Sequence, residues 1–395
     1  MTLLPWTIYW LITGAVLVSL LGIMIVNLLV LPSIKEYAQQ NIEVPAVAVL
    51  VPARNEEANI EGCLRSLLAQ DYANFQVWLY DDASSDSTGA IARLIAHEDK
   101  SRGKLYVVSG SGEPPAGWLG KANACHEMYL AMLEHSSPDY LLFTDADVRF
   151  GPKCLGQAIA TAQKLNSGLL SIFPRQITGS WAERLAVPTL LHWTVYQFLP
   201  LPLAMWARSG PAFAAANGQF MLFTHQAYKA LGGHTAIRDE ILEDVALARA
   251  TKQAGYSTIL ADGRGHVWTR MYNGSHEVWE GYSKNAFAFF GYSPPLLFAG
   301  IAVLLLLYVL PVILLLYGAV TEQTGIILPA AGAYVLGVIP RLLIAFRFRY
   351  RPADALLHPL SVMLMVLIDL NSLRWWITGK STWKGRKYEG LGKHG

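Results

Sequence analysis

Charged side chains are scarce in this sequence. Of its 395 residues only 15% are Asp, Glu, Lys or Arg, and 53% are hydrophobic. An average soluble domain is about one quarter charged, so this composition indicates a membrane protein. The formal net charge is only +2, and the chain has no basic run with interleaved aromatic residues. Nucleic acid is therefore excluded as its main partner.

Cysteine is nearly absent as well. The cysteines at Cys63, Cys125 and Cys154 are odd in number, widely spaced and outside any metal-ligand pattern. This spacing argues against a disulfide framework and against a zinc site. We expect buried free thiols in a reducing compartment.

Long hydrophobic runs, by contrast, stand at both ends of the chain. The first extends from Ile8 to Leu31. At about 1.5 Å per residue it is long enough to cross a hydrocarbon core of about 30 Å. It lacks the basic start, the short apolar stretch and the small-residue cleavage site of a signal peptide. We therefore expect an uncleaved transmembrane anchor over residues 1–34.

The second half of the chain contains three more such runs. Leu296–Gly318 and Ile326–Ala345 are each long enough to span, which predicts two transmembrane helices over residues 296–345. The third run, Ala355–Ile377, contains a proline and two charged residues and is a weaker candidate.

The charges that flank these runs predict the topology, because Lys and Arg favour the cytoplasmic side of a membrane. Lys35 places the central block inside, and the loop around Glu322 has no basic residue, which places that loop outside. The next flank is basic (Arg347, Arg349 and Arg351), and so is the end of the chain (Lys380, Lys384, Arg386 and Lys387). Residues 346–395 are therefore predicted to form a re-entrant or in-plane segment and a basic cytoplasmic tail. A plain fourth span is the alternative.

Residues 35–295 have a different pattern, in which short apolar runs alternate with stretches of helical period. The predicted strands are Val47–Val51, Gln76–Tyr80, Leu105–Val108 and Tyr140–Thr144, and the predicted helices are Glu56–Gln70, Ser87–Glu98, Lys121–Leu133 and Pro152–Leu165. Such alternation is typical of βαβ units that form a parallel sheet covered by helices. We therefore expect a single cytoplasmic α/β domain over this range.

Polar residues follow the predicted strands where each strand ends, and in an open α/β sheet such residues collect at one edge. Glu56 follows the first strand, Asp82 follows the second, and the fourth delivers Asp145 and Asp147. Two carboxylates separated by one residue suit a hard divalent cation. A helix cap is the alternative for an acidic residue at a strand end, and we prefer it for Asp86.

Together these motifs resemble those of the family 2 glycosyltransferases, which have a GT-A fold, a Rossmann-like domain with a mostly parallel sheet. The donor half of the resemblance is carried by Val-Pro-Ala-Arg-Asn-Glu-Glu (51–57), Asp-Asp-Ala-Ser-Ser-Asp (81–86), Gly-Trp-Leu-Gly-Lys-Ala-Asn-Ala (117–124) and Asp-Ala-Asp (145–147). The acceptor half is carried by Asn-Gly-Gln-Phe (217–220), Gly-Gly-His (232–234), Glu-Asp-Val-Ala-Leu (243–247) and Arg-Met-Tyr (270–272). With its hydrophobic ends and the closing Trp-Lys-Gly-Arg (383–386), the chain is similar to membrane-bound members that glycosylate ceramide, hopanoids or carotenoids.

On the donor side the resemblance implies a role for each residue. The residues that would line the nucleoside pocket are Pro52, Ala53, Glu56 and Asp82. Lys121, in a flexible Gly-rich loop, would reach the diphosphate, with a solvated surface lysine as the alternative. Asp145 and Asp147 would engage the nucleotide and a divalent metal, Mg²⁺ or Mn²⁺.

On the acceptor side the resemblance implies that Asp244 is the general base, which deprotonates the acceptor hydroxyl for a direct, inverting displacement. Its neighbour Glu243 either shares in this charged site or is a helix-start acid favoured by the helix dipole. Arg270 and Tyr272 would close over the donor, with the arginine facing phosphate. A cation that reaches lipid headgroups is the alternative for Arg270.

One departure from the family bears on processivity. Processive members carry Gln-x-x-Arg-Trp, whereas Arg374-Trp375 has Asn371 at the glutamine position. The resemblance therefore implies transfer of a single sugar, from a nucleotide-diphosphate sugar such as a UDP-sugar, to a hydroxyl of a lipid or lipid-like acceptor. The reaction would take place at the cytoplasmic face of the inner membrane. The alternatives are a synthase that extends a cell-surface polysaccharide and a non-catalytic transferase homologue.

The acceptor is expected to approach through the apolar stretch between Trp181 and Trp206, which three prolines interrupt. We expect two short helices that lie in the membrane interface, with Trp181, Trp193 and Trp206 at headgroup depth. The alternative is that this stretch completes the core of the domain.

Overall fold

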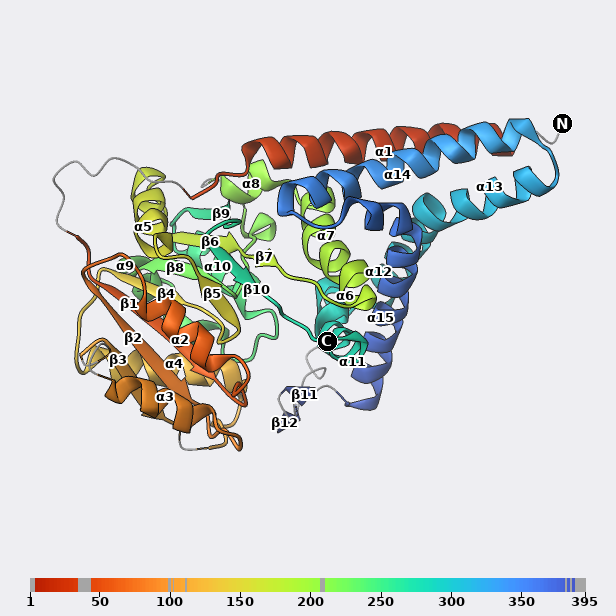
Figure 1. Ribbon diagram of the computed structural model, residues 1–395. Helices are drawn as coiled ribbons and strands as arrows, with labels where there is room; N and C mark the ends of the chain where they lie inside the picture. The colour runs from red at the N-terminus through yellow and green to blue at the C-terminus, as the bar shows by residue number, and fades with distance from the viewer. Residues whose placement is uncertain are drawn as a thin grey trace.

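The structure is a computed structural model that describes residues 4–34, 44–98, 101, 103–110, 112–206, 210–380, 382–383 and 386–387. Two of the basic residues used to predict the topology, Lys35 and Lys384, lie outside this set. The described residues form an α/β domain and a group of long apolar helices that extends away from one side of it (Figure 1).

A mostly parallel sheet, as predicted, forms the centre of the α/β domain. Its seven strands have the order β3-β2-β1-β4-β8-β6-β9, and β8 runs antiparallel to both of its neighbours. The strands are β1 (Val47–Ala53), β2 (Phe75–Asp81), β3 (Leu105–Ser109), β4 (Tyr140–Phe143), β6 (Leu169–Phe173), β8 (Met221–Thr224) and β9 (Thr258–Asp262). The first four confirm the predicted strands, whereas β8 is not among them.

Helices cover both faces of the sheet. One face packs against α2 (Ile60–Leu68), α3 (Thr88–His97) and α5 (Cys154–Lys164), and the other against α4 (Gly120–Leu133), α9 (His225–Ala230) and α10 (Glu243–Gln253). In α2, Ile60, Leu64 and Leu67 recur at helical spacing and are buried against the sheet, which is the pattern of an amphipathic helix. The three cysteines are free and buried, as predicted.

A second, three-stranded sheet connects distant parts of the domain. It has the order β5-β10-β7, formed by β5 (Val148–Phe150), β10 (Val267–Thr269) and β7 (Arg175–Gln176). Its register places Thr269 opposite Val148, directly after the Asp-Ala-Asp turn. The remaining short elements of this half are η3 (Pro211–Phe213) and η4 (Gly233–Ile237), and the described end of the chain contains β11 (Thr382–Trp383) and β12 (Arg386–Lys387).

Among the described residues, four helical segments are long and apolar enough to cross a membrane: Trp6–Val30, Pro294–Val320, Thr324–Phe348 and Pro352–Thr378. They comprise α1 (Leu4–Val30); α12 (Pro294–Leu304), η6 (Leu305–Val309) and α13 (Leu310–Val320); α14 (Thr324–Phe348); and η7 (Pro352–Leu357) with α15 (His358–Thr378). Helix α14 packs against both α1 and α13, and these three extend together away from the α/β domain (Figure 1).

The stretch between Trp181 and Trp206 is divided into short helical pieces. They are α6 (Trp181–Val187), η2 (Pro188–Trp193), α7 (Thr194–Phe198) and α8 (Leu201–Met205). Trp181 is 66% exposed and Trp206 is 56% exposed, as expected for side chains that face a membrane interface. Trp193 is fully buried, with its ring edge-on to those of Tyr308 and His358. The expectation that Trp193 faces the headgroups is therefore wrong, because this side chain belongs to the core of the apolar helices.

Helix α15 differs in direction from the other long apolar helices. In Figure 1 it runs across α1 and α14 instead of along them. It packs against α6, α11 (Ser275–Asn285) and η5 (Ala286–Phe290), which lie beside the α/β domain. The length of α15 alone would allow a span, so its direction is the feature that bears on the topology.

Candidate active site

The loops that follow β1 and β2 lie side by side and are joined by hydrogen bonds. The parallel register pairs Ala53 with Asp81. The backbone N–H of Asp82 donates to the carbonyl of Ala53 at 2.8 Å, and Arg54 Nη1 donates to the carbonyl of Asp82 at 2.5 Å. Asp82 is 2% exposed. The predicted nucleoside residues Pro52, Ala53 and Asp82 therefore come together at one edge of the sheet.

Glu56 connects this group to the acidic centre of the site. Its backbone N–H donates to Thr88 Oγ1 at 2.7 Å, and its carboxylate accepts from Asn59 Nδ2 at 3.0 Å. The charge of Glu56 acts on the carboxylates of both Asp145 and Asp147. The predicted nucleoside residue Glu56 thus lies within electrostatic reach of the Asp-Ala-Asp turn.

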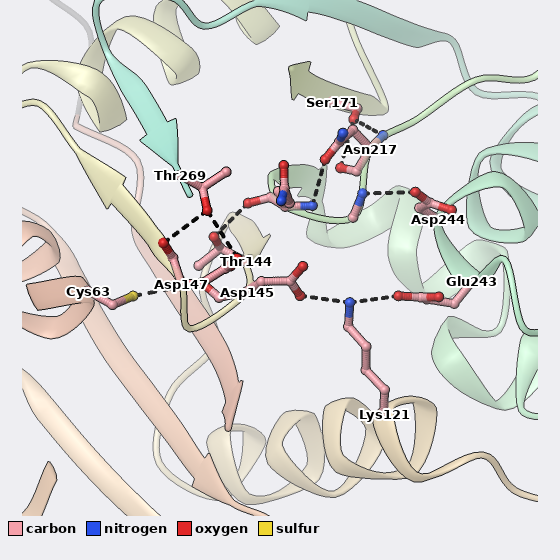
Figure 2. Close-up of polar contacts among 12 residues, drawn as sticks. Cys63, Lys121, Thr144, Asp145, Asp147, Ser171, Asn217, Glu243, Asp244 and Thr269 are labelled. Carbon is pink, nitrogen blue, oxygen red and sulfur yellow. Dashed lines mark hydrogen bonds and ion pairs between the residues drawn. The ribbon is translucent and has the colours of Figure 1, made fainter. Parts of the chain in front are cut away.

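Lys121 stands between two carboxylates from different elements. Its Nζ lies 2.7 Å from Asp145 Oδ1 and 2.7 Å from Glu243 Oε1 (Figure 2). Burial alone would lower the pKa of Lys121, but the two carboxylates outweigh that effect and hold the pKa well above its usual value. Lys121 occupies the first turn of helix α4, which confirms the helix predicted over Lys121–Leu133 and makes the predicted loop position of this residue wrong. The ammonium therefore starts from a rigid element and reaches across the site.

Asp147 has one satisfied and one unsatisfied carboxylate oxygen. Oδ2 accepts from Thr269 Oγ1 at 3.0 Å, whereas Oδ1 is buried and has no hydrogen-bond partner in the described part of the chain. Burial, together with the charges of Asp145 and Glu56, raises the pKa of Asp147 to about 7. Crowded carboxylates with a free buried oxygen are suited to hold a divalent cation.

The described residues do not supply a complete metal shell. Among them, no group of three His, Cys, Asp or Glu side chains is arranged to hold a metal ion. Mg²⁺ and similar ions bind through one or two carboxylates together with substrate phosphates and water. The pair of Asp145 and Asp147 fits that arrangement, in which the donor completes the shell.

Glu243 and Asp244 begin helix α10. Asp244 Oδ2 accepts from the backbone N–H of Gly218 at 3.0 Å, and Oδ1 accepts from the N–H of Val245 at 2.8 Å. Burial and the neighbouring charge of Glu243 raise the pKa of Asp244 to about 7, against the opposing effect of these N–H groups and of Lys121. A carboxylate with this pKa can accept a proton near neutral pH.

The Asn-Gly-Gln loop before β8 lies directly against these carboxylates. A β-carbon on Gly218 would lie 3.5 Å from Glu243 Oε1 and 3.6 Å from Lys121 Nζ. The loop is fixed by buried hydrogen bonds: Asn217 N–H donates to Ser171 Oγ at 2.7 Å, and Thr144 Oγ1 donates to the carbonyl of Gln219 at 2.7 Å (Figure 2). The N–H group that orients Asp244 is therefore held on a rigid backbone.

Arg270 is engaged with a residue that the motif analysis does not include. Its guanidinium makes two hydrogen bonds, both of 3.1 Å, to the buried carboxylate of Glu183 at the start of α6. Glu183 also accepts from the N–H groups of Gly179 and Gly274, at 2.6 and 2.8 Å. Burial opposes ionisation, but Arg270 and these N–H groups hold the pKa of Glu183 down to about 2. The pattern Ser180-x-x-Glu183 is the sequence signal of the capping box found here.

Tyr272 lies close to the acidic centre. Its ring centre is 5.0 Å from that of Tyr282 on α11. Burial raises the pKa of Tyr272, and the charge of Asp147 adds to this rise. The structure therefore places Tyr272 with the predicted donor residues, while Arg270 faces Glu183. The sequence motifs do not predict a role for Thr269, which donates a hydrogen bond to Asp147. Its position next to Arg270 in the sequence is the only signal for such a role.

Comparison with known proteins finds a match to one family over part of this domain. The profile described as "Glycosyl transferase family 2" matches residues 48–199. A 4,4'-diaponeurosporenoate glycosyltransferase of Staphylococcus aureus (strain MRSA252) is 27% identical over 369 residues, which cover 88% of this chain and 89% of the relative. The corresponding protein of strain USA300 is 26% identical over the same length.

Among solved structures, the fold resembles that of a mannosyltransferase from Pyrobaculum calidifontis in complex with GDP-mannose and Mn²⁺. The TM-score is 0.50 at 19% sequence identity, and the match covers 91% of this chain and 99% of that chain. The likeness agrees with the GT-A type of α/β fold predicted from the sequence.

Proposed function

We propose that this chain is a family 2 glycosyltransferase that transfers one sugar from a nucleotide-diphosphate sugar to a lipid acceptor, with inversion at the anomeric carbon. We infer a UDP-sugar as the donor and a hydroxyl as the acceptor group, both from the family resemblance of the motifs. The Staphylococcus aureus relative, which acts on 4,4'-diaponeurosporenoate, supports a lipid-like acceptor.

The observation that carries the proposal is the position of Lys121 between Asp145 and Glu243. Asp145 belongs to the turn beside the nucleoside residues, whereas Glu243 begins the helix that also carries Asp244. One ammonium therefore lies where the donor half and the acceptor half of the motifs meet. A diphosphate bound at Asp145 and Asp147 would lie within reach of Lys121, which would exchange a carboxylate for phosphate.

Asp145 and Asp147 would hold the divalent metal, with Thr269 orienting Asp147. When bound, such an ion supplies charge neutralisation for the diphosphate leaving group. The free Oδ1 of Asp147 is the feature of this chain that fits it best.

Asp244 would act as the base. The acceptor oxygen attacks the anomeric carbon while its proton passes to the Asp244 carboxylate, and the bond from that carbon to the diphosphate oxygen breaks. The N–H groups of Gly218 and Val245 hold the carboxylate in one orientation, so less entropy is lost on reaching the transition state. Glu243 helps by keeping the pKa of Asp244 near the working pH.

Tyr272 is well placed to close over the donor, because Asp147 and Tyr282 are its neighbours. The predicted phosphate contact of Arg270 requires this residue to exchange Glu183 for phosphate. Since Glu183 also accepts from three backbone N–H groups, it can keep its charge satisfied while Arg270 moves.

The direction of α15 supports an in-plane helix. If α1 and α14 cross the membrane, a helix that runs across them lies along its surface (Figure 1). Both ends of α15 then stay on the side of the α/β domain, which the basic residues Arg347, Arg349 and Arg351 predict to be cytoplasmic. Trp181 and Trp206 are exposed at the two ends of the stretch that contains α6, η2, α7 and α8. They would mark the route of the acceptor from the bilayer.

The first test is nucleotide binding. The full chain, purified in mild detergent, is titrated with UDP, GDP, ADP and CDP in the presence and absence of Mn²⁺ or Mg²⁺, and so is Asp147→Asn. We expect metal-dependent binding of one nucleotide, at least tenfold weaker in the variant. A folded protein that binds none of them would favour a non-catalytic homologue.

The second test is product analysis. With the radiolabelled sugar donor and a membrane lipid extract, we expect one labelled product that partitions into organic solvent. A water-soluble polymer would instead identify a polysaccharide synthase. The relative's acceptor is named as a carboxylate, so free lipid acids are included beside hydroxylated lipids. If sugar is transferred to the lipid acids alone, the acceptor group is a carboxylate and not the hydroxyl proposed here.

A further inference from the structure

The apolar helices enclose a buried arginine that the proposed reaction does not use. Arg341, on α14, is 1% exposed. Its Nε and Nη1 atoms are buried, and in the described part of the chain they have no hydrogen-bond partner. His358, the first residue of α15, is also 1% exposed, and both of its ring nitrogens lack a partner there. Ser361, one turn later on α15, has a buried hydroxyl in the same condition.

These groups form one cluster to which four elements contribute: α14, α15, η2 and η6. Arg341 interacts electrostatically with His358 on α15 and with His192 on η2. The ring of His358 lies 4.6 Å from that of Trp193 and 5.1 Å from that of Tyr308. The indole N–H of Trp193 and the hydroxyl of Tyr308 are buried without a hydrogen-bond partner among the described residues. Through His358, the buried donors of Trp193 and Tyr308 thus belong to the same cluster as Arg341.

The cluster has too little negative charge. A guanidinium stays protonated in proteins, and burying it without a counter-charge is strongly unfavourable. Asp354 acts on Arg341 electrostatically, but its carboxylate is held by Arg184 through two hydrogen bonds of 2.8 and 2.5 Å. Arg341 and Trp193 can only donate, so further neutral donors do not balance the charge. An acceptor-rich anion would satisfy both needs.

We propose that this cluster binds the oxyanion of a lipid, a phosphate or a carboxylate, with Arg341 as its main ligand. The planar fork of arginine suits two parallel hydrogen bonds to such a group. The surrounding residues favour a lipid over a free anion, because Trp193 and Tyr308 belong to a hydrophobic cluster that also contains the buried Phe348, Val362 and Leu304. The source is either a membrane phospholipid or a lipid that carries an acid group of its own.

The test is lipid binding by the full chain in the absence of any sugar donor, so its outcome is independent of the transferase proposal. Wild type and Arg341→Met are delipidated in detergent and titrated separately with dioleoylphosphatidylglycerol, oleate and dioleoylphosphatidylcholine. Thermal unfolding and native mass spectrometry report binding. We expect saturable stabilisation by an anionic lipid and not by phosphatidylcholine, with an apparent affinity at least about tenfold weaker in the variant.

The controls separate a site from a general charge effect. Arg351→Gln removes an exposed arginine close to the same end of α14 and should bind like wild type. Arg341→Lys keeps the charge but loses the planar fork, so it should fold and bind more weakly than wild type. A response to phosphatidylglycerol identifies a phospholipid, and a response to oleate alone identifies a lipid acid. Equal binding by wild type and Arg341→Met, or no preference for anionic lipids, would overturn the proposal and leave water as the only occupant.

Discussion

Asp244 should determine the pH dependence of sugar transfer. Burial and the charge of Glu243 raise its pKa from 3.8 to about 7. A general base works only in its unprotonated form. We therefore expect kcat/KM for the acceptor to rise about tenfold per pH unit below pH 7 and to level off above it. Asp244→Asn should lower kcat/KM by roughly 10²- to 10⁴-fold on the plateau above pH 7, because it removes the proton acceptor and keeps the shape.

Glu243→Gln tests the electrostatic cause of this pKa. The substitution removes the like charge next to Asp244, so the pKa of Asp244 should fall and the midpoint of the profile should move to lower pH. Two adjacent charges in a partly buried site interact by roughly 1–3 kcal/mol, which corresponds to about one or two pH units. The assay is transfer of radiolabelled sugar to lipid by the purified chain between pH 5.5 and 8.5.

Two results would refute this reasoning. A flat profile, together with near-normal activity of Asp244→Asn, would mean that the acceptor oxygen arrives already ionised, as a carboxylate does. A midpoint that stays in place or moves upward in Glu243→Gln would mean that Glu243 is not the neighbour that raises the pKa. The first result would refute the role of Asp244 as the general base. The second would refute only the electrostatic explanation of its raised pKa.

Three further substitutions test the parts of the site around this base. Asp147→Asn should abolish the metal dependence of nucleotide binding. Thr269→Val should weaken the apparent metal affinity by roughly 10- to 100-fold, because the Thr269 hydroxyl orients Asp147. Metal titrations of the two variants that match the wild-type titration would contradict both predictions. Glu183→Gln should destabilise the chain by about 3 kcal/mol at pH 7, since the pKa of Glu183 is lowered from 4.5 to about 2. This stability is present above pH 4.5 and is lost as the pH falls toward 2, so the gap in unfolding temperature from wild type should narrow on acidification; a constant gap would exclude the charge as its cause.

The sequence predicts that the donor-side residues lie at one edge of the sheet. Glu56, Asp82, Asp145 and Asp147 each follow an apolar strand, and parallel strands bring their carboxyl ends to one edge whatever the details of packing. For Lys121 the sequence gives two conflicting signals, because the helical period begins at this residue whereas its neighbours Gly-Trp-Leu-Gly favour a loop. The structure follows the helical period and begins α4 at Gly120.

Contacts between distant segments are the part that the sequence does not contain. The capping-box pattern at Glu183 predicts a helix start, but its main ionic partner, Arg270, lies far along the chain on another element. Likewise, an arginine within an apolar run can be read from the sequence, whereas the burial of Arg341 against η2 and α15 depends on how three segments pack. The antiparallel strand β8 is missed for the same reason, since both of its neighbours in the sheet come from elsewhere in the sequence.

Lys121→Gln should move the pH profile in the direction opposite to Glu243→Gln. The ammonium lowers the pKa of Asp244, whereas Glu243 raises it, although the two side chains are paired at 2.7 Å. Removing Lys121 should therefore raise the midpoint above that of wild type, and it should also weaken nucleotide diphosphate binding by about tenfold or more. A distortion of the site would not be expected to shift the midpoint in opposite directions in the two variants. Midpoint shifts of opposite sign would therefore show that these two charges set the pKa of Asp244. Shifts of the same sign in both variants would instead indicate that breaking the ion pair rearranges the site.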